Sequence, residues 1–441
     1  MGTLGRPMAL TGRAALAALL GALVILAVRA TVALYAVEGL LLAAVIADLA
    51  LAAPVRPLQL VRSGDTTVRL GETAAVTLTV TNPSRRRLRG VLRDAWPPSA
   101  GAGQHHHRLD VPRGSGQRVT TTLTPVRRGD RQASTVTVRS AGPFGLAARQ
   151  GRHAVPWAVR VIPPFRSRRH LPEKLARLRE LDGLHRSLRR GQGSEFDSLR
   201  EYVIGDDVRS IDWRGTARRA DVVVRTWRPE RDRRLLIVLD TGRTSAGRVG
   251  GPAGGLPRLD CAMDAALLLG AIAARAGDRV DLIAFDRRVR ARVHGASRSS
   301  VLPAMVEAMA PLEAELIESD GAAMAGAILG QARHRSLVVL LTELNAAAIE
   351  EGLMPSIGAL TARHAVVLAA VSDPRADALA AGRGDAEQVY GAAAAEQARG
   401  QRRRIAATLR RSGVEVVDAP PERLPPALAD RYLALKAAGR L

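Results

Sequence analysis

Cysteine, lysine and aromatic residues are scarce in this sequence. Cys261 is the only cysteine in 441 residues, which excludes an intrachain disulfide and fits a reducing compartment. Phenylalanine, tryptophan and tyrosine make up 3% of the chain, so aliphatic side chains must fill the cores. Lys174 and Lys436 are the only lysines, and nearly all of the net charge of +23 therefore comes from arginine. Such a bias arises either from genome composition or from a function such as phosphate binding.

The motifs of common enzyme classes are also missing. The chain has no Gly-x-x-x-x-Gly-Lys phosphate loop, no Gly-x-Ser-x-Gly elbow and no histidine pair with metal-ligand spacing on a helix. Asp206, Asp207 and Asp212 could be read as hydrolase carboxylates, but Arg209 and Arg214 beside them would keep them ionised. The sequence therefore predicts a protein that acts by binding and not as an enzyme.

Two apolar runs stand near the amino terminus. Residues 14–28 carry no charge, and residues 31–53 carry only Glu38 and Asp48. Each run approaches the roughly 20 residues needed to cross the hydrocarbon core of a bilayer. We therefore predict a cytoplasmic N-terminus over residues 1–13 and a two-span transmembrane hairpin over residues 14–54. A secretory signal peptide is the alternative, because Arg13 directly precedes an apolar run.

Arginines around these runs indicate the orientation of the hairpin. The connection holds only Arg29, whereas the flanks hold Arg6, Arg13, Arg56 and Arg62. Because positive charge collects on the cytoplasmic side, we expect a multi-pass protein of the cell membrane whose later domains are cytoplasmic. Glu38 and Asp48 cost about 3 kcal/mol each at mid-depth in lipid when charged. We expect Asp48, near the end of its run, to reach the headgroup level.

Residues 58–162 have the pattern of an all-β domain. Valine and leucine alternate with threonine in runs such as Thr73–Thr81 and Arg118–Thr124. This alternation predicts strands with one buried face, arranged as a small antiparallel β-sandwich. The domain would serve either as an interaction module or as a spacer above the membrane. Neighbouring side chains on an extended chain point in opposite directions, so His105 to His107 are expected in a solvated loop and not around a metal ion.

The connecting segment, residues 163–233, is rich in charges of both signs. Residues 171–188 have helical spacing, and arginines, acids and aromatics alternate after them. Acids at this density would repel a nucleic-acid backbone, so we expect ion pairs within the segment, buried aromatics and a stiff surface for protein docking. The expected interaction residues are Glu195, Phe196, Arg200, Tyr202, Gly205, Asp206, Asp207, Arg209, Asp212, Trp213 and Arg214.

Several motifs of this chain resemble those of a known family. They read Gly-Ser-Glu-Phe-Asp-Ser-Leu-Arg-Glu-Tyr (193–202), Gly-Asp-Asp-Val-Arg-Ser-Ile-Asp-Trp-Arg (205–214), Arg-Pro-Glu-Arg-Asp (228–232) and Gly-Pro-Phe-Gly-Leu (142–146). Together they resemble the signature of the family known as domain of unknown function fifty-eight. The resemblance implies a membrane-anchored protein with a von Willebrand factor A-like domain that acts with a MoxR-type AAA+ ATPase.

Strand and helix patterns alternate from residue 234 to 418, and a final helix is expected in residues 419–441. Apolar runs predict strands at residues 235–239, 280–285, 336–341 and 365–371. We expect a mostly parallel sheet covered by helices, and the family resemblance implies that this is the Rossmann-like α/β architecture of a von Willebrand factor A-like domain. Ligands bind at the carboxyl ends of such strands, where Asp240, Glu343 and Asp373 stand.

The loop Asp240-Thr-Gly-Arg-Thr244 follows the first of these strands. In von Willebrand factor A-like domains that bind a divalent ion, this loop reads Asp-x-Ser-x-Ser, a later loop supplies threonine, and another strand ends in aspartate. Here Gly242 lacks a hydroxyl, the later loop has no obvious threonine, and Glu343 replaces the aspartate. We expect a degenerate metal site of Asp240, Thr244 and Glu343. Either it still holds Mg²⁺, or Asp240 and Thr244 cap the turn or pair with an arginine such as Arg243.

These patterns together predict a multidomain membrane protein. We expect an adaptor or assembly factor that binds a MoxR-type AAA+ ATPase and other membrane proteins, but no nucleic acid. Two alternatives stay open. The positive charge allows a nucleic-acid or anionic-lipid binding protein, and the loop at Asp240 allows a metal-dependent hydrolase, which has the least support.

Overall fold

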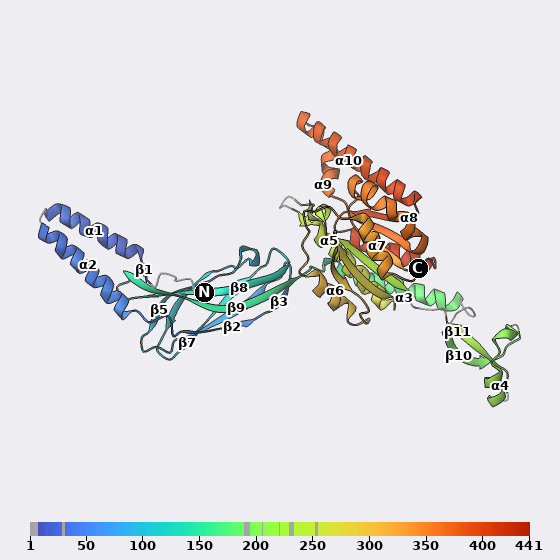
Figure 1. Cartoon of the computed structure of the whole chain (residues 1–441), viewed down its shortest axis with the longest axis horizontal. Coiled ribbons are helices and arrows are strands. Elements are labelled where there is room, and N and C mark those ends of the chain that lie inside the picture. Colours follow the sequence, from blue (N-terminus) through green and yellow to red (C-terminus); the bar gives the residue numbers. More distant parts are fainter. Residues whose placement is uncertain are drawn as a thin grey trace. The chain divides into compact units, whose positions relative to one another are not determined.

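The computed structural model of the protein describes residues 8–28, 31–188, 195–204, 206–219, 221–228, 233–251 and 255–441. The chain forms two compact units, residues 1–162 and residues 163–441. The first unit combines apolar helices with two β-sheets, and the second contains a six-stranded sheet covered by helices (Figure 1). The protein is therefore a mixed α/β multidomain chain.

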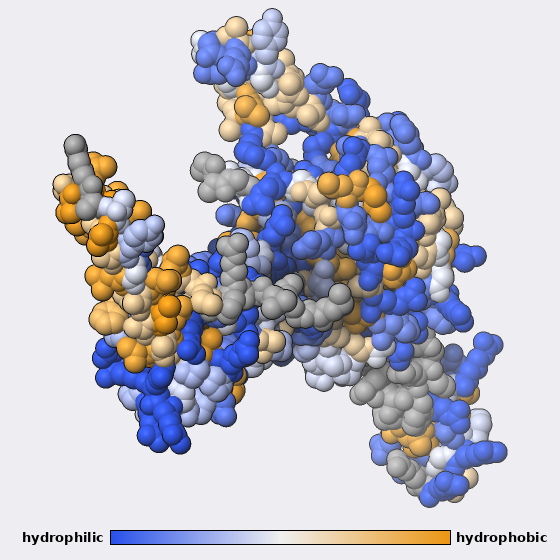
Figure 2. Space-filling model, turned by 60° about the vertical axis from the view of Figure 1, so that its left-hand side comes forward, coloured by the Kyte–Doolittle hydropathy of each residue, from blue (hydrophilic) through white to orange (hydrophobic). Residues whose placement is uncertain are grey.

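Two apolar helices lead into the first unit, α1 (Gly12–Val28) and α2 (Thr31–Leu51). They pack side by side, and a Cβ atom on Gly21 would lie 2.5 Å from Cγ1 of Val37, so their close contact requires a glycine there. The helix α2 is long and apolar enough to cross a membrane, while α1 is apolar but shorter. Apolar side chains cover the outward surface of both helices, as the orange atoms in Figure 2 show.

Two β-sheets follow the helices. The larger sheet has the order β1-β9-β8-β5-β6, with β3 paired to β9, and the smaller sheet has the order β2-β4-β7. Pairing is antiparallel except between β3 and β9. The strands are β1 (Met8–Leu10), β2 (Gln59–Gly64), β3 (Thr67–Arg69), β4 (Ala74–Thr81), β5 (Leu88–Asp94), β6 (His106–Val111), β7 (Gly116–Leu123), β8 (Gly129–Ala141) and β9 (Ala147–Ile162). Alternate residues such as Leu78 of β4 and Leu92 of β5 meet in one core shared by both sheets.

A buried ion pair connects these two sheets. Arg62 of β2 pairs with Asp94 of β5, and the two side chains are 1% and 2% exposed. Trp96 Nε1 donates a hydrogen bond to the Asp94 carboxylate at 2.8 Å, and Thr121 of β7 donates another at 3.2 Å. The guanidinium of Arg62 also lies 5.5 Å from the centre of the Trp96 ring. The core thus contains a charged network whose members come from both sheets.

The expectation of a solvated histidine loop is wrong for His107 and wrong only in part for His106, which is exposed but lies in a strand. His106 and His107 belong to strand β6, and His107 points into the domain with an exposed fraction of 7%. Its Nε2 lies 3.1 Å from Thr121 Oγ1. Burial lowers the pKa of His107 because the charged ring would lose its hydration. The alternation of strand β6 explains the inward position of this one ring.

The second unit is built on a six-stranded sheet with the order β16-β15-β12-β17-β18-β19. All pairs are parallel except β15 with β16. The strands are β12 (Arg234–Asp240), β15 (Arg279–Phe285), β16 (Val289–Val293), β17 (Leu337–Leu341), β18 (Ala365–Val371) and β19 (Glu415–Ala419). Central strands such as β17 are buried along their whole length because helices cover both faces of the sheet.

Helices from early and late parts of the second unit cover this sheet. The helices α5 (Arg258–Arg275) and α11 (Leu424–Ala437) lie on one face, with α3 (Leu171–Leu188) packed against them. The other face carries α7 (Gly321–Gln331), the π-helix η5 (Ala347–Leu353), α8 (Met354–Arg363) and the C-terminal part of α10 (Ala386–Arg411). The shorter helices α6 (Val301–Met309) and α9 (Pro374–Ala380) contact α5 and α10 respectively.

Candidate functional site

The strand order reverses between β12 and β17. From β12 the chain proceeds to β15 and β16 on one side and later returns to β17, β18 and β19 on the other. Crossovers then leave in opposite directions, which opens a crevice at the carboxyl ends of these two strands. Asp240 is the last residue of β12, and Thr342 directly follows β17. The topology therefore places both residues at the expected ligand position of the sheet.

Three hydroxyl groups surround the Asp240 carboxylate, which is 3% exposed. Ser319 Oγ donates to Oδ1 at 2.5 Å, Thr342 Oγ1 donates to Oδ2 at 2.6 Å, and Thr244 Oγ1 donates to Oδ2 at 3.2 Å. The backbone N–H of Gly242 adds a fourth hydrogen bond at 2.9 Å. Three separate loops therefore supply this group of oxygen atoms, which we call the hydroxyl ring.

Ser319 occupies the space that Gly242 leaves free. A Cβ atom at Gly242 would lie 2.2 Å from Ser319 Oγ and 2.9 Å from the carbonyl oxygen of Ile317. A side chain at residue 242 and the observed position of Ser319 therefore exclude each other. The hydroxyl that the sequence lacks at Gly242 has a counterpart in Ser319, which sequence reasoning missed because it looked for a threonine in that loop.

Glu343 does not reach the hydroxyl ring, contrary to its expected place in a metal site. Its carboxylate pairs with Arg258 Nε at 2.8 Å and with Arg402. Arg402 also pairs with Asp418 at 2.6 Å. Burial raises the pKa of Glu343, and the two guanidinium groups oppose that shift. Thr342 instead supplies the oxygen next to Asp240, because consecutive residues at a strand end point to different sides.

Arg243 does not pair with Asp240 either. It forms an ion pair with Glu318, while Asp240 accepts hydrogen bonds from the turn that follows it, at Gly242 and Thr244. Among the residues that the structure describes, no lysine or arginine forms an ion pair with Asp240. The buried carboxylate is thus held by neutral donors only, an arrangement that leaves its charge uncompensated.

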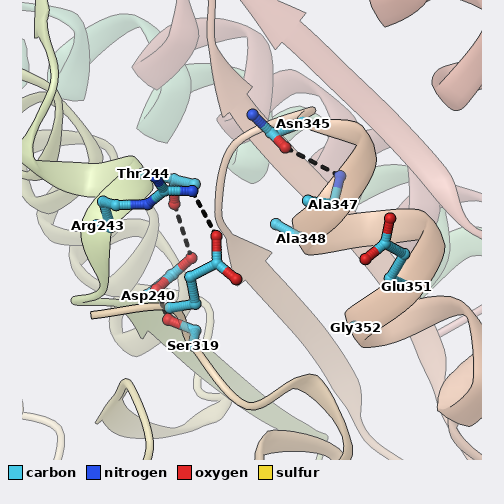
Figure 3. A pocket seen from close by; sticks show the side chains of 10 residues that line it. Asp240, Arg243, Thr244, Ser319, Asn345, Ala347, Ala348, Glu351 and Gly352 are labelled. Carbon is cyan, nitrogen blue, oxygen red and sulfur yellow. Dashed lines mark hydrogen bonds and ion pairs between the residues drawn. The ribbon is translucent and has the colours of Figure 1, made fainter. Parts of the chain in front are cut away.

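A pocket of about 170 Å³ lies beside the hydroxyl ring. It is lined by Asp240, Arg243, Thr244, Glu318, Ser319, Asn345, Ala347, Ala348, Glu351 and Gly352. Figure 3 shows the π-helix η5 forming one wall, with Asp240 and Ser319 on the opposite side. Asn345 accepts a hydrogen bond from the N–H of Ala347 at 3.0 Å and so fixes the start of that wall. Single π-helical turns occur frequently at functional sites.

The oxygen atoms of the hydroxyl ring are suitable ligands for a hard divalent cation. One carboxylate and three hydroxyl oxygens lie together at the edge of the pocket. Mg²⁺ prefers oxygen ligands, commonly one or two carboxylates completed by water. Asp240 would hold the ion, with Thr244, Ser319 and Thr342 as neutral oxygen ligands. When bound, the ion would supply a positive charge at this edge of the sheet.

The signature motifs around residues 195–202 and 206–214 fold into a small structure of their own, which we call the platform. It consists of β10 (Glu195–Glu201), η3 (Val208–Ser210), α4 (Trp213–Arg219) and β11 (Val223–Arg228), with β10 antiparallel to β11, and of the described residues that connect them, such as Tyr202 and Ile204. Gly205 lies outside the described residues, and for Glu195 and Phe196 only the backbone is described. The platform is thus a hairpin with a helix packed on it.

Acidic residues stabilise the platform from within. Asp206 pairs with Arg200 at 2.5 Å, as the charge pattern predicted, and Asp212 pairs with Arg225 of β11 at 2.8 Å. Asp212 also accepts a hydrogen bond from the N–H of Gly215 at 2.9 Å. Asp207 accepts one from the N–H of Arg209 at 3.0 Å and caps η3. The arginine beside each carboxylate lowers the pKa of Asp206 and of Asp212.

Apolar side chains of the platform face outward. Ile204 is 96% exposed, Trp213 66% and Val208 60%, whereas Tyr202 is half-buried. The prediction that the aromatic residues are buried is therefore wrong for Trp213. Arg209, Arg214 and Arg218 are exposed too, and the described part of the chain gives them no acidic partner. The platform thus presents apolar and cationic side chains together.

The comparison with protein families identifies the chain. Residues 198–415 match the family described as Protein of unknown function DUF58. The chain belongs to the DUF58 family. The match begins inside β10 and ends at the start of β19, so the DUF58 region contains the platform from residue 198 onward, the hydroxyl ring and the pocket. No curated protein matches this sequence.

Two solved structures each match about a quarter of this DUF58 protein. The CARDB domain of a Pyrococcus furiosus protein, in complex with di-metal ions, has 14% sequence identity and a TM-score of 0.18, covering 24% of this chain and 91% of that domain. A β-glucosidase from Listeria innocua has 17% identity and a TM-score of 0.16, covering 22% of this chain and 16% of that enzyme. Likenesses with such TM-scores support no conclusion about fold or function here.

Proposed function

We propose that this DUF58 protein is a membrane-anchored adaptor or assembly factor that binds other proteins through the platform. The observation that carries the proposal is the exposure of Ile204, Val208 and Trp213 on a structure whose acids are already engaged. Exposed side chains such as Trp213 and Ile204 gain about 1.5–3 kcal/mol each when a partner covers them. A MoxR-type AAA+ ATPase is the proposed partner, as the family resemblance implies.

The membrane anchor is the second part of the proposal. The helix α2 has the length and composition of a membrane span. With 17 residues, α1 reaches about 26 Å at 1.5 Å per residue, close to the thickness of a hydrocarbon core. Both helices would cross the bilayer as a hairpin. The arginines that flank the hairpin favour cytoplasmic domains, where an ATPase is available.

A binding assay with matched variants tests the adaptor function. Full-length protein in detergent is used to capture AAA+ ATPases from solubilised cells, and the affinity of the captured ATPase is then measured with purified components. Trp213→Ala should weaken binding at least about tenfold, since tenfold corresponds to 1.4 kcal/mol. Tyr390→Ala is the control, because Tyr390 is 78% exposed on α10 outside the platform. Equal affinity for the wild type and Trp213→Ala would refute the platform as the binding surface.

Magnesium binding is a second candidate function, favoured by the hydroxyl ring. The strand order and the position of the ring at the point of reversal support the proposal of a von Willebrand factor A-like domain. Calorimetric titration of the full-length protein with MgCl₂ should give heat of binding that Asp240→Asn abolishes. Glu318→Gln is the control, because Glu318 lines the same pocket but lies outside the ring. Magnesium-dependent hydrolysis lost in Asp240→Asn would favour the hydrolase alternative.

A further inference from the structure

One loop of the larger sheet is held by both apolar helices. The loop, residues 142–146, has the sequence Gly-Pro-Phe-Gly-Leu and connects β8 to β9. Asp48, in the last turn of α2, accepts hydrogen bonds from the backbone N–H groups of Phe144 at 2.9 Å, Leu146 at 2.6 Å and Ala147 at 2.8 Å. The side chain of Asp48, which the sequence predicts at headgroup level, is fully buried in the protein against this loop.

The start of α1 holds the same loop from the other side. Thr11, directly before α1, donates its hydroxyl to the carbonyl oxygen of Gly145 at 2.5 Å, and its N–H donates to Leu146 O at 3.0 Å. The short strand β1 then pairs with β9, with Leu10 opposite Ala147. Arg149 of β9 donates from Nε to Leu49 O of α2 at 2.8 Å. Each helix is thus tied to the loop by several hydrogen bonds.

The contact between Asp48 and the loop requires a glycine at position 142. A Cβ atom on Gly142 would lie 2.1 Å from Asp48 Oδ1, so any other residue there would displace the carboxylate. A buried carboxylate that accepts three backbone N–H groups is strongly held, since each donor would otherwise lose its partner in the interior. The loop therefore keeps a fixed position at the end of the helical pair.

Apolar residues at this end are exposed to solvent. Phe144 is 58% exposed, Met8 60%, Leu10 73% and Leu51 53%. They come from the loop, from β1 and from the end of α2, which the hydrogen bonds above bring together. We call these four residues the apolar collar. Arg13 belongs to the same end, because its guanidinium would be 3.1 Å from a Cβ atom on Gly145.

We propose that the apolar collar lies in the headgroup interface of the bilayer, with Phe144 inserted beside the span of α2. The inference rests on the proposed membrane anchor. Asp48 lies three residues before the end of α2, about 4.5 Å along the helix axis, so the loop begins within one turn of the end of the span. Aromatic and aliphatic side chains with flanking arginines are typical of this interface, where apolar bodies enter and charged groups stay in water.

Site-specific labelling in lipid vesicles tests the position of the collar. Cys261 is buried, so a polar fluorescent maleimide labels an engineered cysteine selectively in the native protein. The full-length variants Phe144→Cys and Leu10→Cys report on the collar, and Leu42→Cys reports on the middle of α2, where Leu42 is 62% exposed. Val126→Cys is the control, because Val126 is 67% exposed. It follows the end of β7, whereas the start of β7 at Gly116 lies opposite Thr81, which pairs with Gln59 at the start of the strand after α2. Val126 is therefore at the end of the smaller sheet away from α2.

Nitroxide lipids then measure depth by quenching. A nitroxide near the headgroup should quench most of the fluorescence at residues 144 and 10, while a nitroxide near the chain end should quench residue 42 most strongly. Neither should quench residue 126. Quenching of residue 42 without quenching of residues 144 and 10 overturns the inference and leaves the anchor intact. Absence of quenching at residue 42 overturns the proposed anchor and the inference with it.

Discussion

The buried ion pair between Arg62 and Asp94 allows a strict test of how the first unit is stabilised. Asp94→Ala leaves the Arg62 guanidinium, 1% exposed, without a counter-ion in the core. It also removes the acceptor of Trp96 Nε1 and Thr121 Oγ1. Breaking a buried pair in this way typically costs about 3–5 kcal/mol, because an uncompensated charge remains in the interior. We expect a loss of that size in the free energy of unfolding.

The double variant Arg62→Met, Asp94→Leu should recover much of this loss. Replacing both charges by apolar side chains removes the desolvation penalty together with the attraction, and such exchanges are often nearly neutral. We therefore expect the summed losses in free energy of unfolding of the single variants Arg62→Met and Asp94→Leu to exceed the loss of the double variant by about 2–3 kcal/mol. An exposed pair serves as the control: Arg87 and Asp110 are 51% and 52% exposed, and Asp110→Ala should change stability far less.

Urea denaturation of the full-length protein in detergent measures these differences, and hydrogen exchange of peptides from β2 and β5 assigns them to the first unit. The denaturant slope should stay the same in all variants, since the change concerns stability and not compactness. A cost below about 1 kcal/mol for Asp94→Ala, or strict additivity of the two single substitutions, would refute the reasoning.

Three further predictions concern the second unit. Ser319→Ala should weaken Mg²⁺ binding roughly tenfold in calorimetry, because one of the three hydroxyl groups next to Asp240 is lost; an unchanged affinity would show that Ser319 is not a ligand. His364→Leu should raise the free energy of unfolding by about 1–2 kcal/mol, because both ring nitrogens are buried without a hydrogen-bond partner in the described part of the chain. Burial also lowers the pKa of His364, so the unfolded chain binds a proton more readily than the folded one. The wild type should therefore lose stability as the pH falls below about 6.5. His364→Leu should lose less stability over the same pH range, and equal losses in urea titrations would contradict this. Finally, burial raises the pKa of Cys261 to about 12, so a thiol reagent should label it only after unfolding, and rapid labelling of the native protein would disprove its core position.

Much of the second unit could be predicted from local patterns. The strand at residues 365–371 has the predicted bounds, because a short, continuous apolar run identifies it. The helix α7 was missed since its sequence consists of glycine, alanine and other small or apolar residues without a polar face. The edge strand β16 was missed because arginines interrupt its apolar pattern.

The hydroxyl ring was predicted only in part. Asp240 and Thr244 stand in one loop and could be found from their spacing, whereas Ser319 and Thr342 follow other strands and meet Asp240 only through the order of the sheet. The partner of Asp212 was missed for a similar reason. Arg225 reaches it from the opposite strand of a hairpin, and the register of that hairpin is not evident from charge spacing.

In the second unit, Arg258 connects the loop of the hydroxyl ring to helix α10 through a series of contacts. Its guanidinium donates to the carbonyl oxygen of Thr244 at 2.7 Å and pairs with Glu343, which in turn pairs with Arg402 of α10. A ligand that drew Thr244 toward Asp240 would strain these contacts and would thereby alter the conformation or stability of α10. A change in the rate of amide hydrogen exchange in α10 on addition of Mg²⁺ would reveal this coupling. Unchanged exchange at saturating Mg²⁺ would show that binding at Asp240 does not alter α10.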